Sequence, residues 1–118
     1  RQQYAHARIC SIFRRAGIER ASVRGLPISL DATQERRLAL RLLAYPSAID
    51  ATLESYSPHK LCTYVYELAT DFTAFYEHCP VLKADEPLRS SRLALADLTA
   101  RTLAHALGLL GIDAPEQM

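Results

Sequence analysis

The chain has 118 residues, of which 49% are hydrophobic and 23% are charged, and its formal net charge is +1. This length suits one domain with a buried core and is too short for a catalytic unit beside it. The sequence contains no apolar run of the roughly 20 residues that cross a bilayer and no charged-then-apolar leader. We therefore expect a cytoplasmic protein with no membrane partner.

The basic residues gather in the first third of the chain. Residues 1–41 hold nine arginines against Glu19, Asp31 and Glu35, a net charge of +6, so the remainder carries −5. A positive face suits the phosphate backbone of a nucleic acid. However, twelve of the fourteen basic residues are arginine, and codon usage in a GC-rich genome produces the same excess. The charge distribution alone therefore does not distinguish an RNA-binding face from an ordinary solvated face.

The first predicted element is a helix over residues 3–16, with Gly17 as its C-terminal capping residue. Its apolar residues recur at helical spacing and form one stripe, which consists of Tyr4, Ala5, Ile9, Ile12, Phe13 and Ala16. Arg8 falls inside this stripe. Because an unpaired buried charge costs several kcal/mol, Arg8 must be paired, reach the rim, or await a ligand. With Tyr4 one turn away, Arg8 is a candidate for holding an RNA base or phosphate.

Residues 18–30 interrupt the helical pattern and are predicted to form a connecting loop in which Arg20 and Arg24 are solvated. Asp31 is the predicted N-cap of a second helix that ends before Pro46. Three basic residues of this helix are predicted to form its solvent-exposed face, namely Arg36, Arg37 and Arg41. A short third helix is predicted over residues 47–55.

The fourth predicted helix has the clearest pattern in the sequence. Ser57 is its expected N-cap, Pro58 its first residue, and Pro80 marks its end. Its apolar residues recur every three or four positions, namely Leu61, Val65, Leu68, Ala69, Phe72, Phe75, Tyr76 and Cys79. Near the C-terminal end, Tyr76 is either plain core or an aromatic ring at the domain edge.

A last helix, capped by Ser90 or Ser91, is predicted to run to about Leu110. It is rich in leucine and alanine around much of its circumference, which places it at the centre of the fold. No long segment alternates with the period of a strand. The sequence therefore predicts an all-α bundle of about five helices that forms one domain over residues 1–118.

The three cysteines, Cys10, Cys62 and Cys79, form no C-x-x-C pair and are predicted to be buried and reduced. Each has a histidine nearby in the sequence, but these pairs lie on different elements and lack the spacing of a zinc finger. No residues pair a nucleophile with a base. We therefore predict no metal site, no cofactor site and no catalytic residue in this chain.

Three stretches of the sequence carry a family resemblance. Residues 4–9 read Y-A-H-A-R-I, residues 75–82 fit F-Y-x-x-C-x-V-L, and residues 109–118 fit L-L-G-I-x-x-P-E-x-M. In order and spacing these resemble the C-terminal, all-helical anticodon-binding domain of arginyl-tRNA synthetases, the DALR type. The signature that names this type is present only as Ala96-Asp97-Leu98 with Arg101. Two further departures are His105-Ala106 before the Leu107-Gly108 pair and Gln117 in place of a usual basic residue.

The resemblance implies a role within a longer enzyme. Such an enzyme is a class I synthetase that joins arginine to its tRNA, using ATP and magnesium in a separate N-terminal catalytic domain. Because the chain begins with Arg1 and its only methionine is Met118, we expect it to be a fragment that lacks that domain. The expected partners are tRNA for arginine and the enzyme's own catalytic domain, with no DNA. We expect the chain to fold alone as a monomer.

The resemblance also implies the residues that contact tRNA. By their positions in the family motifs, Arg8, Tyr76 and Met118 are predicted to contact anticodon bases, with Tyr4 and Arg15 as further candidates. The central cytosine of arginine anticodons is the implied target. The alternatives are a helical protein-interaction module and the related domain of another synthetase.

Overall fold

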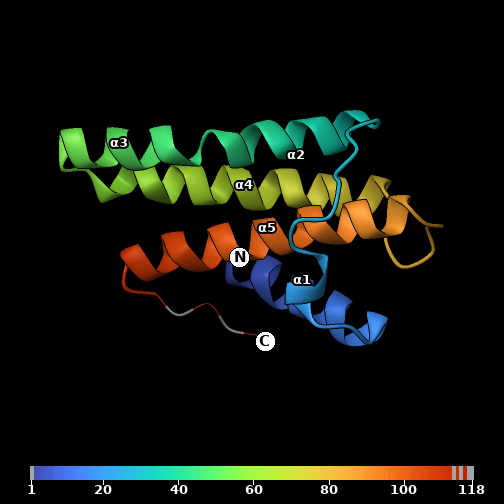
Figure 1. The fold of residues 1–118 in the computed structure, drawn as a ribbon. Coiled ribbons are helices and arrows are strands. Elements are labelled where there is room, and N and C mark those ends of the chain that lie inside the picture. Colours follow the sequence, from blue (N-terminus) through green and yellow to red (C-terminus); the bar gives the residue numbers. More distant parts are fainter. Residues whose placement is uncertain (1, 113, 115, 117–118) are drawn as a thin grey trace.

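The computed structural model describes residues 2–112, 114 and 116. All regular secondary structure in these residues is helical (Figure 1). Five α-helices and one 3-10 turn occur among these residues: α1 (Gln2–Ala16), η1 (Arg20–Val23), α2 (Thr33–Leu43), α3 (Tyr45–Ser55), α4 (Pro58–His78) and α5 (Leu88–Leu109). The prediction of an all-α bundle of about five helices is confirmed.

Helices α2 and α3 follow one another along α4, with only Ala44 between them (Figure 1). The Ala44 N–H donates to the Leu40 carbonyl at 3.1 Å and so completes α2, while the Ala44 carbonyl accepts from Ala48 at 3.1 Å and opens α3. Pro46 is the second residue of α3, a position where its missing N–H leaves no hydrogen bond unmade. The helical path is therefore interrupted at Ala44, and α3 continues along α4 beyond the end of α2 (Figure 1).

Helix α5 is the central element, as predicted. It contacts α1, η1, α2 and α4, and it has buried side chains around most of its circumference. Helix α1 packs against α4 and α5 and ends at Gly17, whose φ of +72° suits the left-handed turn that closes a helix.

The hydrophobic core is one continuous cluster to which α1, α2, α4 and α5 contribute. Its largest fully buried side chains include Phe72 and Phe75 of α4 and Ile9 and Ile12 of α1. The predicted stripe of α4 is buried at every position except Tyr76, which is half-buried. Helix α3 lies along the first half of α4, and α2 lies along its middle and second half, where Arg41 pairs with Asp71 (Figure 1). Helix α1 also packs against the second half of α4, where Arg8 and Arg15 meet Tyr76.

Two predicted helix starts are wrong. The N-cap of α2 is Ala32, not Asp31; its N–H donates to Glu35 Oε1 at 2.7 Å. The other oxygen of the fully buried Glu35 accepts from Arg92 Nε at 2.9 Å, which ties α2 to α5. Helix α5 begins at Leu88, two to three residues before the predicted caps. There the Glu86 carboxylate, just ahead of the helix, accepts from the N–H and hydroxyl of Ser90.

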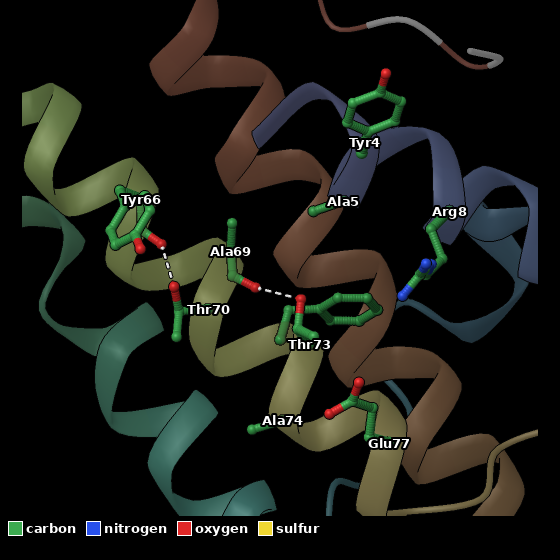
Figure 2. A pocket seen from close by; sticks show the side chains of 10 residues that line it. Tyr4, Ala5, Arg8, Tyr66, Ala69, Thr70, Thr73, Ala74 and Glu77 are labelled. Carbon is green, nitrogen blue, oxygen red and sulfur yellow. Dashed lines mark hydrogen bonds between the residues drawn. The ribbon is translucent and has the colours of Figure 1, made fainter. Parts of the chain in front are cut away.

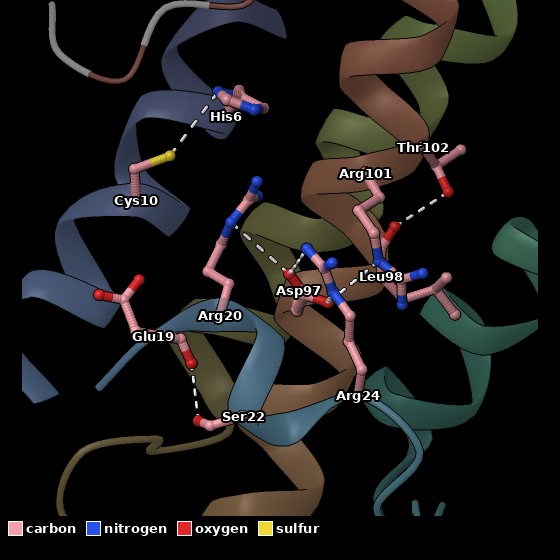
Figure 3. A network of polar contacts seen from close by, with 10 residues as sticks. All are labelled: His6, Cys10, Glu19, Arg20, Ser22, Arg24, Asp97, Leu98, Arg101 and Thr102. Carbon is pink, nitrogen blue, oxygen red and sulfur yellow. Dashed lines mark hydrogen bonds and ion pairs between the residues drawn. The ribbon is translucent and has the colours of Figure 1, made fainter.

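The prediction that Arg20 and Arg24 are merely solvated is wrong, because both converge on Asp97 (Figure 3), although the Arg24 side chain stays 42% exposed. The Asp97 side chain is fully buried, and its oxygens lie 3.0 Å from Arg24 Nε, 3.0 Å from Arg101 Nε and 3.6 Å from Arg20 Nε. A buried carboxylate is tolerated only where opposite charges surround it. These ion pairs hold η1 against α5.

Arg41 was also predicted on the solvent-exposed face of α2, but it pairs with acidic residues of α4. Its Nε lies 2.8 Å from Asp71 Oδ2 and its Nη1 lies 3.2 Å from Glu67 Oε1, both on α4. The Tyr64 hydroxyl donates to the Arg41 carbonyl at 2.6 Å, and burial raises the pKa of this phenol to about 12, so it remains a donor. Arg37 keeps the predicted exposure, with 71% of its side chain accessible.

The cysteines differ in exposure, contrary to the prediction that all are buried. Cys10 and Cys79 are buried, Cys62 on α4 is exposed, and all three are free thiols.

Among the described residues, no helix is both long enough and apolar enough to cross a bilayer.

Candidate nucleic-acid interface

The surface where α1 meets α4 brings three predicted residues together: Arg8, Arg15 and Tyr76. The Cζ atom of Arg8 lies 5.2 Å from the centroid of the Tyr76 ring. Arg15 Nη2 donates to the Tyr76 hydroxyl at 3.1 Å. Arg8 and Arg15 are seven residues apart on α1, and this two-turn spacing places both on one helix face. One tyrosine of α4 thus holds two exposed arginines of α1.

Tyr76 connects this surface to the core. Its ring stacks on Phe72, with ring centroids 6.1 Å apart and an interplanar angle of 21°. Phe72 is fully buried, so the tyrosine ring rests on a fixed support, while its hydroxyl reaches the exposed edge. Of the two sequence alternatives for Tyr76, the domain edge describes its position better.

Arg8 lies on the rim of the buried stripe rather than within it. Its side chain is exposed, and the part of the chain that the structure describes gives its guanidinium no hydrogen bond or ion pair. At an exposed site, a cation over an aromatic ring gains about 0.5 to 1 kcal/mol. This contact is enough to orient the guanidinium and leaves its N–H groups free to bind a ligand.

Tyr4 is 59% exposed, so its assignment to the buried stripe is wrong. At 100° per residue, position 4 lies well outside the sector that Ala5, Ile9 and Ile12 share, and its ring stays in solvent. It nevertheless lies beside Arg8 on one wall of an open groove of about 600 Å³ (Figure 2). The opposite wall is formed by α4, from Tyr66 to Glu77.

The last candidate, Met118, lies outside the described residues. Within them, the C-terminal segment touches α1, because Arg14 Nη1 donates to the Glu116 carbonyl at 3.3 Å. Arg14 is exposed beside Arg15, and these two arginines with Arg8 make this end of α1 positively charged.

Sequence reasoning missed the α4 wall of the groove. Its polar members, Thr70, Thr73 and Glu77, read as an ordinary solvated face. A usable indication was their spacing, since residues 66, 70, 73 and 77 recur at three and four positions and therefore share one side of the helix.

The sequence profile of the DALR anticodon binding domain matches residues 2–118. The chain belongs to this family. The arginine-tRNA ligase of Thermobifida fusca is 54% identical over 117 residues, and that of Pseudoalteromonas atlantica is 51% identical over 118. Each match covers 98% of this chain and 20% of the relative.

Solved structures agree with this assignment. The arginyl-tRNA synthetase of Thermus thermophilus superposes with a TM-score of 0.87 at 43% identity, over 99% of this chain and 20% of that one. The arginyl-tRNA synthetase of Plasmodium falciparum gives a TM-score of 0.88 at 36% identity, over 99% and 21%. The resemblance seen in the sequence is confirmed, and this DALR domain spans about a fifth of the length of the relatives it matches.

Proposed function

We propose that this DALR domain reads the anticodon loop of tRNA for arginine as part of an arginine-tRNA ligase. The observation that carries the proposal is the cluster of Arg8, Arg15 and Tyr76 at the edge of an open groove. The ligase joins arginine to its tRNA in the cytoplasm, with ATP and magnesium bound in another part of the polypeptide. The enzyme acts as a monomer, and this domain contributes binding rather than chemistry.

The cluster has the chemistry that an unstacked RNA loop requires. RNA loops are recognised by stacking of splayed bases on aromatic rings or guanidinium planes, by hydrogen bonds to base edges, and by contacts to phosphates. Arg8 offers the guanidinium plane, and the neighbouring Arg14 and Arg15 offer charge to the phosphates. Stacking of this kind supplies about 1 to 3 kcal/mol per base.

The opposite end of the bundle favours contact with the enzyme's own catalytic domain. There an apolar groove of about 350 Å³ runs between α3 and α5. It is lined in part by Leu53, Tyr56 and Leu109, which are 66%, 93% and 58% exposed. A protein-interaction module would use the same surface, but its binding would lack the steep salt dependence of tRNA binding.

Arg8→Ala, introduced in the full-length ligase, is expected to raise the KM for tRNA about tenfold, which is the loss of one stacking or phosphate contact. The KM values for ATP and arginine should stay at wild type, because Arg8 is exposed and supports no other described side chain except Tyr76. Steady-state aminoacylation kinetics with each substrate varied in turn measures the three constants.

The matched control is Arg37→Ala on α2. It removes the same charge from an exposed position whose one ion pair among the described residues is with Asp71, at 3.8 Å. Wild-type kinetics are expected for this variant. Equal losses for all three substrates in Arg8→Ala, or an equal loss in Arg37→Ala, would count against the proposed site.

A further inference from the structure

The groove between α1 and α4 has two chemically different walls (Figure 2). Arg8 lies on the α1 wall, while Thr70, Thr73 and Glu77 lie on the α4 wall. The first wall presents hydrogen-bond donors. On the second wall, Thr70, Thr73 and Glu77 present acceptors, while the Tyr66 hydroxyl at its far end can both donate and accept.

The two threonine hydroxyls have already used their hydrogens. Thr73 Oγ1 donates to the Ala69 carbonyl at 3.0 Å, and Thr70 Oγ1 donates to the Tyr66 carbonyl at 2.9 Å. A hydroxyl with a committed hydrogen offers a ligand only its lone pairs. The threonine oxygens facing the groove therefore act as acceptors.

Glu77 continues this row of acceptors one turn further along α4. An ionised carboxylate accepts hydrogen bonds and donates none. Within the described residues, Glu77 has no hydrogen bond and no ion pair, not even with Arg8 on the facing wall. Its oxygens are therefore available to a ligand that carries N–H donors.

The α1 wall has the opposite character, because an arginine has five N–H donors and no acceptor. The Tyr76 ring, 5.2 Å from Arg8 Cζ, keeps the guanidinium beside the groove. A ligand that spans both walls must present donors toward α4 and acceptors toward α1.

Among the RNA bases, cytosine has this pattern on its Watson–Crick edge. Its exocyclic amine is a donor, and its N3 and O2 are two adjacent acceptors that match the paired N–H groups of an arginine. Uracil places an acceptor where cytosine has the amine and a donor at N3. Guanine has one acceptor and two donors. Adenine has the amine but only one acceptor beside it.

We propose that Thr73 and Glu77 are specificity-determining residues that accept from the exocyclic amine of a cytosine, whose N3 and O2 accept from Arg8. This inference rests on the proposed reading of the anticodon loop and adds the residues that select the base. Thr70 extends the acceptor row toward Tyr66.

The test uses the full-length ligase with two tRNAs that differ only in cytosine or uracil at the centre of the anticodon. The measured quantity is the ratio of kcat/KM for the two tRNAs. Glu77→Gln keeps the shape but adds N–H donors that suit uracil, so the ratio should fall about tenfold. Thr73→Val removes one acceptor and should lower the ratio about threefold.

Matched controls come from the same chain. Thr63→Val removes a hydroxyl of α4 that likewise donates to the carbonyl four residues earlier, His59, but lies outside the groove. Glu54→Gln neutralises an exposed carboxylate on α3. Both should keep the wild-type ratio, and Glu77→Asp should retain most of the discrimination because it keeps the carboxylate. Because Thr73 and Glu77 are exposed, wild-type melting temperatures are expected throughout.

Two results would overturn the inference, and they are distinguishable. If Arg8→Ala weakens tRNA use but Glu77→Gln and Thr73→Val keep the wild-type ratio, the domain binds the loop without reading cytosine in this groove. If Arg8→Ala also leaves tRNA use unchanged, the proposed function itself fails. A lowered ratio in the two groove variants, with both controls unchanged, supports the assignment.

Discussion

Asp97→Ala is expected to lower the free energy of unfolding by about 3 kcal/mol. The Asp97 side chain is fully buried and lies within 3.6 Å of three arginine Nε atoms. Its removal leaves Arg20, Arg24 and Arg101 converging on one point without a counter-charge. Among the described residues, Arg20 Nη1 is already buried without a hydrogen-bond partner, which adds to the imbalance. Urea unfolding of the 118-residue chain, followed by helical circular dichroism, measures the loss.

The arginines around Asp97 provide the comparison for this variant. Arg101 is 45% exposed and pairs with Asp97 one turn earlier on the same helix, so Arg101→Ala should cost only about 1 kcal/mol. Asp97→Asn keeps the size of the side chain and separates the loss of charge from the cavity. A loss for Asp97→Ala no larger than that for Arg101→Ala would show that the network does not hold η1 on α5.

Tyr76→Ala is expected to lower kcat/KM for tRNA about 10- to 100-fold in the full-length ligase, the loss of one or two arginine contacts of about tenfold each. The variant removes both the ring beneath Arg8 and the hydroxyl that accepts from Arg15, so both arginines lose their orientation. Tyr76→Phe keeps the ring and its stacking on Phe72, and should cost only about threefold.

Aminoacylation kinetics distinguishes these roles. A loss confined to tRNA, large for Tyr76→Ala and small for Tyr76→Phe, fits a ring that supports Arg8. Equal losses in the two variants would instead assign the effect to the hydroxyl, and unchanged kinetics in Tyr76→Ala would remove the ring from the site. Because Tyr76 is half-buried, the melting temperature of each variant is measured in parallel.

Local patterns predicted the helices where capping and periodicity coincide. Ser57 and Pro58 open α4 at the expected residues, and the apolar stripe of α4 is buried almost as predicted. The starts of α2 and α5 were not predicted. They depend on Glu35 and Glu86, whose carboxylates accept from backbone N–H groups that no periodicity reveals.

The ion pairs were beyond sequence reasoning because their partners are remote. Arg24 lies 73 residues from Asp97, and Arg41 lies 30 from Asp71. A count of charges places such arginines in solvent unless the packing of the helices is known. Of the ion pairs between described residues, only that of Asp97 and Arg101 has a local spacing, and it falls in the segment that stands for the family's naming signature.

The candidate site was predicted in part. The family motifs named Arg8, Arg15 and Tyr76 separately, but their mutual contacts depend on how α1 packs against α4. The donor and acceptor walls of the groove depend on hydroxyl hydrogen bonds within α4, which a sequence does not display. That these residues contact tRNA stays a prediction.

The central claim is that the surface between α1 and α4 binds the anticodon loop. It is tested most directly by NMR of the isotope-labelled 118-residue chain titrated with a short anticodon stem-loop from tRNA for arginine. The amide resonances of residues 4–15 and 66–77 should shift, those of α3 should not, and replacing the central cytosine with uracil should weaken the shifts. Shifts centred on α2 or α3, or equal shifts with both RNAs at Arg8 and Glu77, would contradict this account.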